Sequence, residues 1–272
     1  MRIATFLLVV VGLGCSAAAQ SPPASSPMTT EALSSRFPPP PGFVPVVVDD
    51  DSFGAWLRQR RLAPIDTPVR RFDGAVVQAS WAKHVVVGID VGTKDLQQCA
   101  DSAIRLYAEY RRARGTLATT TFHATSGDPM PYARYAAGER ARAEGRGLVW
   151  RRGADSVTST SSAVVADRVF STWLDDVFMY AGSLSIARDT VPAGPRLRPG
   201  DLLVIGGSPG HVLVVMDVAE RDDGEQRLLL GQGYMPAQSF HVLGWYAADG
   251  DGVRVPSWPA TFPSTGWRRF AQ

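Results

Sequence analysis

The chain has 272 residues, enough for one large domain or two small ones with a substantial apolar core. Hydrophobic residues make up 45% and charged residues 20%, near the averages of soluble globular proteins, which argues against wholesale disorder and against a multi-span membrane protein. The formal net charge of +2 is too small for general nucleic-acid binding. We therefore expect a folded protein with no nucleic-acid partner.

Residues 1–19 have the pattern of a secretory signal peptide. Arg2 is followed by an apolar run and then by small residues, with Ala17 and Ala19 in the small-x-small cleavage pattern. Lipid anchoring through Cys15 is the alternative, but the residues before it fit a lipoprotein box poorly. We expect an exported protein, periplasmic or extracellular, with no integral membrane segment after signal cleavage.

The rest of the chain divides into a spacer and one domain. Residues 20–41 are rich in Ser, Pro, Thr and Ala, with prolines throughout 38–41, which predicts a disordered spacer. Residues 42–272 are expected to form a single domain. Its first part predicts strands over 44–48, 69–78, 83–91 and 116–125, and helices over 52–60, 95–114, 131–143 and 162–180.

The last third of the domain predicts strands alone. Apolar, β-branched runs indicate strands over 201–205, 211–218, 227–232 and 239–243. Asp223-Gly224 is a turn signal between the middle two. Helices followed by an antiparallel meander predict an α+β fold.

Two residues of this framework could carry chemistry. Cys99 is the only cysteine left after signal cleavage, so it cannot form an intramolecular disulfide and is either a core residue or a reactive thiol. It lies on the predicted helix 95–114, for which Asp95 is the expected N-cap and Gln98 its reciprocal partner. His211 begins a strand that follows the Pro-Gly-Asp segment 199–201. A thiol near a helix N-terminus and an imidazole on a strand are the parts of a cysteine nucleophile and its base.

That order resembles the papain-like cysteine peptidases, and most closely the NlpC/P60 and CHAP cell-wall amidases, in which a Pro-Gly-Asp strand precedes a Gly-His strand. The resemblance implies a papain-like fold, with a helix packed on an antiparallel sheet. It also implies that Cys99 is the nucleophile, that His211 is the general base and that a third polar group orients the imidazole.

A longer set of segments resembles a family of bacterial exported proteins known as domain of unknown function 4846. This family implies no particular reaction. The segments are Ser52 to Leu57 (SFGAWL), Asp90 to Ala100 (DVGTKDLQQCA), Asp175 to Leu184 (DDVFMYAGSL), Gly206 to Asp217 (GGSPGHVLVVMD) and Tyr234 to His241 (YMPAQSFH).

The third member of the triad is less clear from the sequence. The Asp-Gly turn places His211 opposite Pro236, with Gln232, Tyr234 and Gln238 on the same face of the sheet. We choose Gln232 because it interrupts an apolar run. Gln98 could donate to an oxyanion, although helix capping also accounts for it, and His123 is a reserve base that a packed or solvated histidine would equally explain.

One motif favours a different enzyme class. Ser208 lies in a Gly-x-Ser-x-Gly pattern, as in the nucleophile elbow of serine hydrolases, but the elbow needs a helix after it and the next residues predict a strand. The sequence contains no zinc, phosphate-loop or dinucleotide motif, so we expect no metal and no cofactor.

These observations leave two main hypotheses. The first is an exported papain-like cysteine hydrolase, an amidase or peptidase acting on a cell-wall peptide or another envelope amide, with Cys99, His211 and Gln232 as catalytic residues. The second is a non-catalytic envelope binding module with the same fold. It would bind through exposed aromatic residues of the C-terminal third, namely Trp245, Tyr246, Trp258 and Trp267.

Overall fold

The computed structural model describes residues 31–86, 88–153, 162–249 and 251–271. The expected signal peptide, Cys15 and residues 20–30 of the expected spacer lie outside these ranges. Residues 31–41 contain the short helix α1 (Leu33–Arg36), and Leu33 is completely buried. The folded part therefore begins before Gly42, because the apolar Leu33 side chain completes the core. Within the described ranges, no helix combines the length and the hydropathy that a bilayer span requires.

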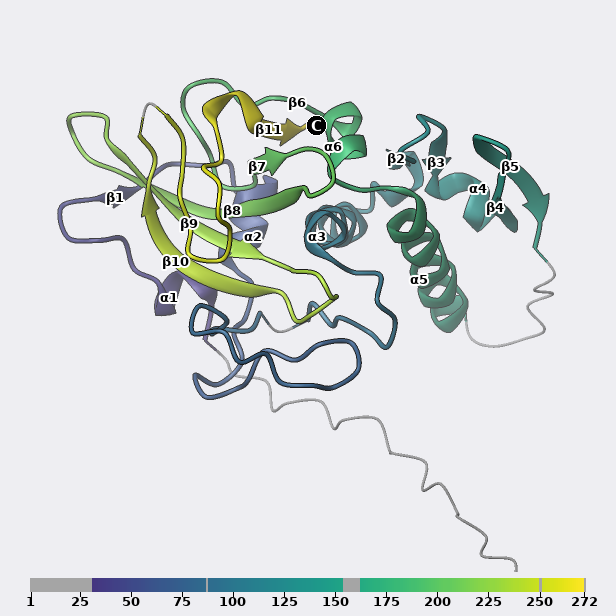
Figure 1. Ribbon diagram of the computed structural model, residues 1–272, viewed down its shortest axis with the longest axis horizontal. Coiled ribbons are helices and arrows are strands. Elements are labelled where there is room, and N and C mark those ends of the chain that lie inside the picture. Colours follow the sequence, from purple (N-terminus) through teal and green to yellow (C-terminus); the bar gives the residue numbers. More distant parts are fainter. Residues whose placement is uncertain (1–30, 87, 154–161, 250, 272) are drawn as a thin grey trace, which may run out of the picture.

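The fold is α+β, and its main element is a seven-stranded antiparallel sheet (Figure 1). The strand order is β10-β9-β8-β7-β11-β6, with β1 paired to the far end of β8. The strands are β1 (Val44–Pro45), β6 (Thr190–Pro192), β7 (Leu202–Ile205), β8 (His211–Glu220), β9 (Gln226–Gln232), β10 (His241–Ala247) and β11 (Trp267–Phe270).

Strand β8 is buried on both faces, which explains its nearly continuous apolar sequence. Val212 and Val214 face the core beneath the helices. Leu213 and Val215 face a second core, which the C-terminal segment closes with Phe262 among others. The predicted strands 201–205, 211–218 and 227–232 are confirmed to within a few residues, and β10 starts two residues later than predicted and extends to Ala247.

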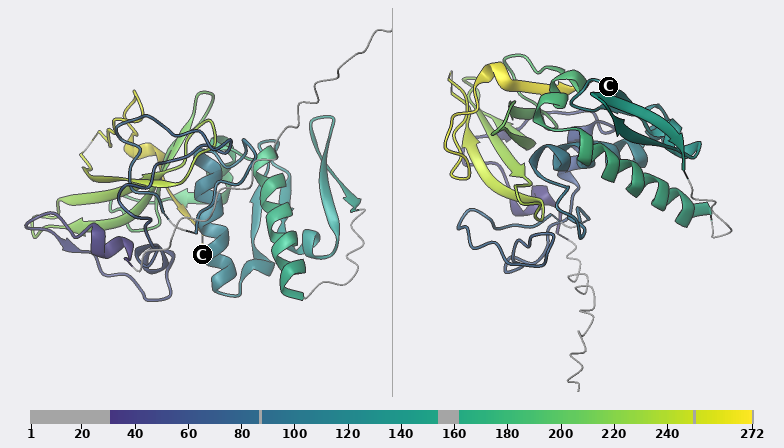
Figure 2. Two further views of the ribbon diagram at one scale, coloured as in Figure 1. Left: turned by 90° about the horizontal axis from the view of Figure 1, so that it is seen from below. Right: turned by 45° about the vertical axis from the view of Figure 1, so that its right-hand side comes forward.

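The helix that carries Cys99 packs against this sheet. Helix α3 (Cys99–Ala113) crosses one sheet face next to the short helix α2 (Phe53–Arg58), and α5 (Ser162–Tyr180) lies beside α3 (Figures 1 and 2). Ser52 caps α2, since its hydroxyl accepts a hydrogen bond from the Ala55 amide at 3.1 Å.

A smaller group of elements lies around α5, away from the main sheet (Figures 1 and 2). It comprises η1 (Leu117–Thr119), β2 (Thr121–His123), β3 (Pro129–Pro131), α4 (Tyr132–Ala136), β4 (Glu139–Glu144) and β5 (Gly147–Arg152). Helix α6 (Ser183–Asp189) connects this group to the main sheet. Near the C-terminus, the short helix η2 (Ser264–Gly266) precedes β11.

Several expectations for local structure were wrong. The helix expected over 131–143 ends at Ala136, because Gly138 has a φ of 86° and the following residues pair as β4 with β5. The segment 69–78 folds back on itself at Gly74, where φ is 84°, and forms only isolated bridges instead of a strand. The strand expected over 83–91 is likewise replaced by isolated β-bridges in the described residues, and Gly88 has a positive φ.

Candidate active site

Cys99 is the first residue of α3, four residues later than the predicted helix start at Asp95. Gln98 is the N-cap, and the Asp101 carboxylate accepts a hydrogen bond from the Gln98 amide at 3.0 Å. Asp95 instead accepts a hydrogen bond from the Ala237 amide at 2.7 Å. The predicted Asp95 cap is therefore wrong, since a tertiary contact uses that carboxylate. The correction places the thiol in the first helical turn, where the orphan amides carry partial positive charge.

The Cys99 thiol lies against the start of β8. The backbone amide of Val212, the residue after His211, lies close enough to the sulfur to favour its thiolate form. Cys99 is only 9% exposed, and burial raises the pKa of its thiol to about 11, while the nearby Val212 amide acts in the opposite direction. At pH 7 the thiol is therefore neutral.

The His211 imidazole is held by an amide and by an aromatic ring. Its Nε2 lies 2.8 Å from Oε1 of Gln232, and its ring stacks on Trp258 with centroids 4.8 Å apart. Burial lowers the pKa of His211 to about 4, and the hydrogen bond to Gln232 only partly opposes this shift. The imidazole is therefore neutral at pH 7 and able to accept a proton.

A chain of hydrogen bonds fixes which His211 nitrogen carries the proton. The Ser239 carbonyl can only accept, so His241 Nδ1, 3.0 Å away, donates to it. His241 Nε2 must then accept from Gln232 Nε2, which lies 3.3 Å away. This orients the amide so that Gln232 Oε1 accepts from His211 Nε2, and the proton-free His211 Nδ1 remains as the basic nitrogen.

His241 belongs to this network but was not predicted from the sequence. It is fully buried and lies opposite Gln232 in the β9–β10 pairing. Burial lowers its pKa to about 4, so it too is neutral. It ends the segment Tyr234 to His241 that carried the family resemblance. The eight-residue connection between β9 and β10 made the pairing of His241 with Gln232 hard to predict from the sequence. Ser257, whose hydroxyl donates to Gln232 Oε1 at 2.9 Å, was also missed, because it lies on an irregular segment.

Among the three candidates for the third residue, Gln232 is the one that bonds a ring nitrogen of His211. Tyr234 packs edge-on against the imidazole and donates its hydroxyl proton to the Ser257 carbonyl. Gln238 lies beyond β9 and forms an isolated bridge with Arg71.

The predicted register of the β8–β9 hairpin needs correction. It would place Val214 opposite Gly233, whereas the structure pairs Val214 with Gly231. Two features cause the shift. The connection between Glu220 and Gln226 has an odd number of residues, and the pairing is irregular between Val215 and Asp217.

A cavity of about 360 Å³ lies beside the thiol. Its walls come from the start of α3, the end of α5 and the turn 206–210, and they include Gln98, Cys99, Met179 and Met235. The Gln98 side chain donates to Asp95 at 3.2 Å. Across the described ranges, no cluster of three or more His, Cys, Asp or Glu residues could hold a metal ion.

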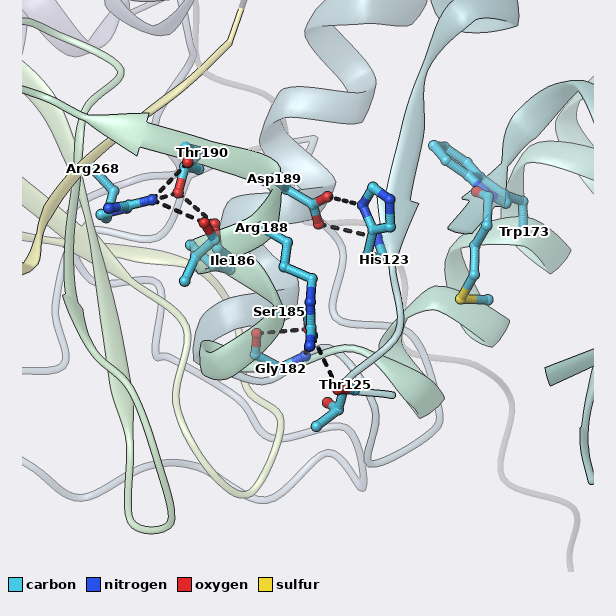
Figure 3. A network of polar contacts seen from close by, with 12 residues as sticks. His123, Thr125, Trp173, Gly182, Ser185, Ile186, Arg188, Asp189, Thr190 and Arg268 are labelled. Atoms are coloured by element: carbon cyan, nitrogen blue, oxygen red, sulfur yellow. Dashed lines mark hydrogen bonds and ion pairs between the residues drawn. The ribbon is translucent and has the colours of Figure 1, made fainter. Parts of the chain in front are cut away.

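The other candidate residues lie in different settings. His123 on β2 bonds Asp189 through Nδ1 at 2.6 Å and through its backbone amide at 3.1 Å, which links β2 to α6 (Figure 3). It does not line the cavity beside Cys99. Ser208 is followed after Gly210 by strand β8, so the helix that a nucleophile elbow requires is missing there.

The C-terminal aromatic residues pack into the protein instead of forming an exposed surface. Trp267 is 8% exposed and belongs to the second core, which Tyr246 also contacts. Trp245 packs against the core beneath the helices, and Trp258 covers His211.

Comparison with known families agrees with the sequence resemblance. The family model described as domain of unknown function (4846) matches residues 33–269. The chain belongs to this family. No curated protein and no solved structure gives a significant match.

Proposed function

We propose that this member of the 4846 family is an exported papain-like cysteine hydrolase, an amidase or peptidase of the cell envelope. Cys99 would be the nucleophile, His211 the general base and Gln232 the residue that orients the base. The observation that supports this best is the His211–Gln232 hydrogen bond at 2.8 Å, on a strand whose next residue, Val212, has its backbone amide near the Cys99 sulfur.

The proposed acylation step starts from a neutral thiol and a neutral imidazole. Nδ1 of His211 takes the thiol proton as the sulfur forms a bond to the substrate carbonyl carbon. The oxyanion develops near the first turn of α3, where unpaired backbone amides favour negative charge. The imidazolium then gives its proton to the leaving amine as the C–N bond breaks.

The proposed deacylation step uses the same residues. His211 removes a proton from water, which attacks the thioester carbonyl, and the thiol leaves with that proton. Gln232 keeps Nδ1 directed towards the reaction in both steps, because its own orientation is fixed by His241. Gln232 and His241 therefore act as positioning residues.

A non-catalytic envelope module is the second candidate. One observation favours it: burial leaves the thiol and the imidazole both neutral, so no thiolate–imidazolium pair exists before substrate binds. Catalysis then depends on proton transfer as the sulfur attacks.

Digestion of isolated peptidoglycan and a panel of peptide amides would separate the two candidates. New amino groups are measured by mass spectrometry for the mature protein and for Cys99→Ser and His211→Ala. The hydrolase predicts amide cleavage that falls by about 10³-fold or more in both variants. Wall binding without cleavage by any of the three proteins would favour the module.

A further inference from the structure

The cavity beside Cys99 has an unbalanced charge. Asp95 and Asp101 both contribute to its walls, and no Lys, Arg or His does. Lys94 is the cationic residue nearest to Asp95 in the sequence. Its Nζ lies 2.7 Å from a carboxylate oxygen of Asp175, and it lines a different pocket. Asp95 supplies the negative charge of the cavity at pH 7, because burial raises the pKa of Asp101 to about 8 and keeps most of that carboxyl protonated.

The two carboxylates have spare capacity to accept hydrogen bonds. In the described part of the chain, both bonds to exposed Asp95 reach Oδ1, from the Ala237 amide and from Gln98 Nε2. Asp101 is 5% exposed and accepts the Gln98 amide through Oδ2, while its Oδ1 has no hydrogen-bond partner. A buried carboxyl oxygen without a partner is costly. Protonation of Asp101 lowers that cost, and the second oxygen of exposed Asp95 is the acceptor that a group in the cavity can reach.

The remaining wall suits an aliphatic chain. Met179 and Met235 line the cavity, although their side chains are 56% and 58% exposed to solvent. Exposed methionines form an adaptable apolar surface that can pack along unbranched methylene groups. Long cationic side chains bury such a stem and keep the charged end near polar groups.

We propose that this cavity binds a substrate group with an unbranched aliphatic stem and a terminal ammonium, such as a lysine-like side chain. The stem lies between Met179 and Met235, and the ammonium bonds Asp95. The proposal rests on the proposed function, because it names the substrate class that the Cys99 site would select. The negative charge of Asp95 disfavours a carboxylate in this position.

Binding can be tested without any turnover, by NMR of the mature protein with ¹³C-methyl methionine. The probes are the N-acetyl methylamides of lysine, norleucine and glutamate. We expect the lysine compound to shift the Met179 and Met235 signals and to bind about fivefold more tightly than the norleucine compound. The glutamate compound should bind most weakly. Met130 and Met216, which are fully buried, provide internal references.

Asp95→Asn is the informative variant, because the amide oxygen still accepts the two existing hydrogen bonds. It should bring the lysine-to-norleucine affinity ratio close to one, whereas Asp223→Asn, a change in an exposed turn, should retain it. High salt should lower the ratio in the unmodified protein, which gives a second test if Asp95→Asn does not fold.

The outcomes separate the two proposals. Equal affinity for the three probes, or shifts at other methionines, would overturn the charge selection even if the protein hydrolyses amides. Lysine preference at Met179 and Met235 without amide cleavage would support the binding site and overturn the hydrolase.

Discussion

Gln232 accepts a hydrogen bond from His211 through Oε1 at 2.8 Å and contacts His241 through Nε2 at 3.3 Å. One neutral amide thus sets the tautomer of the proposed base. A carboxylate in the same place would also stabilise the imidazolium, but an amide does so only weakly. Burial lowers the pKa of His211 to about 4, and the hydrogen bond to the neutral Gln232 amide opposes this shift only in part.

Replacing Gln232 by Glu should therefore raise the pKa of His211. The introduced carboxylate favours the charged imidazolium, with an effect of about 1 to 3 pKa units. It also lacks the N–H that Gln232 offers to His241, so the pKa of His241 should rise too. NMR titration of the histidine rings measures both values. Gln226→Glu, at the other end of β9, should leave them near 4, and unchanged values in Gln232→Glu would contradict the network.

The Cys99 thiol should ionise only at high pH. Its pKa is raised from 9.0 to about 11 by burial, so the thiolate absorbance near 240 nm should develop around pH 11. Because the folded pKa is raised, the unfolded chain loses its proton first, and this group lowers the free energy of unfolding between about pH 9 and 11. The difference spectrum against Cys99→Ser isolates the signal, and a thiolate present below pH 9 would contradict the raised pKa.

Asp101 should make the protein less stable as the pH rises towards 8. Burial raises the pKa of its carboxyl from 3.8 to about 8. In that interval the folded state binds more protons than the unfolded state, so this contribution to stability decreases from about pH 4 to pH 8. Asp101→Asn keeps an acceptor for the Gln98 amide and does not titrate.

Urea unfolding at several pH values measures this effect. The stability of Asp101→Asn relative to the unmodified protein should increase steadily from about pH 4 to pH 8. A difference that stays constant with pH would show that the carboxyl is ionised in the folded state throughout this range.

Gly233 should tolerate no side chain, because the end of β9 closely approaches the start of α3. A Cβ at this position would lie 2.1 Å from Ser102 Oγ and 2.7 Å from the Gln98 carbonyl oxygen. Gly233→Ala should lower the free energy of unfolding by about 1 to 3 kcal/mol and should reduce any amide cleavage. At Gly206 the nearest atom would be 3.4 Å away, on Leu184, so Gly206→Ala is the matched control. Equal stability of the two variants would contradict the close packing.

The sequence contains enough information to predict the centre of the sheet. The β-branched run from His211 and the Asp223-Gly224 turn identify β8 and β9, since neighbouring residues in the chain determine both signals. The same holds for α5, whose helical periodicity is continuous along 162–180. Features that depend on contacts distant in sequence were harder to predict.

The start of α3 shows this difficulty. Both Asp95 with Gln98 and Gln98 with Asp101 match a reciprocal capping pattern, and only the contact between Asp95 and the distant Ala237 amide decides between them. His241 was hidden for a similar reason, because its role depends on strand pairing across a long connection. Helix-forming residues in 139–144 misled the prediction, since these residues pair with β5 instead.

Acylation by p-nitrophenyl acetate tests the central claim most directly, because it requires no knowledge of the natural substrate. The mature protein is mixed with the ester, quenched in acid and digested, and the peptide containing Cys99 is analysed by mass spectrometry. The mature protein should carry an acetyl group on Cys99 and release nitrophenolate. His211→Ala should release much less nitrophenolate, and Cys99→Ser should carry no acetyl group at position 99. An unmodified Cys99 in the folded protein, with acetylation only after denaturation, would show that Cys99 is a core residue and would contradict the account.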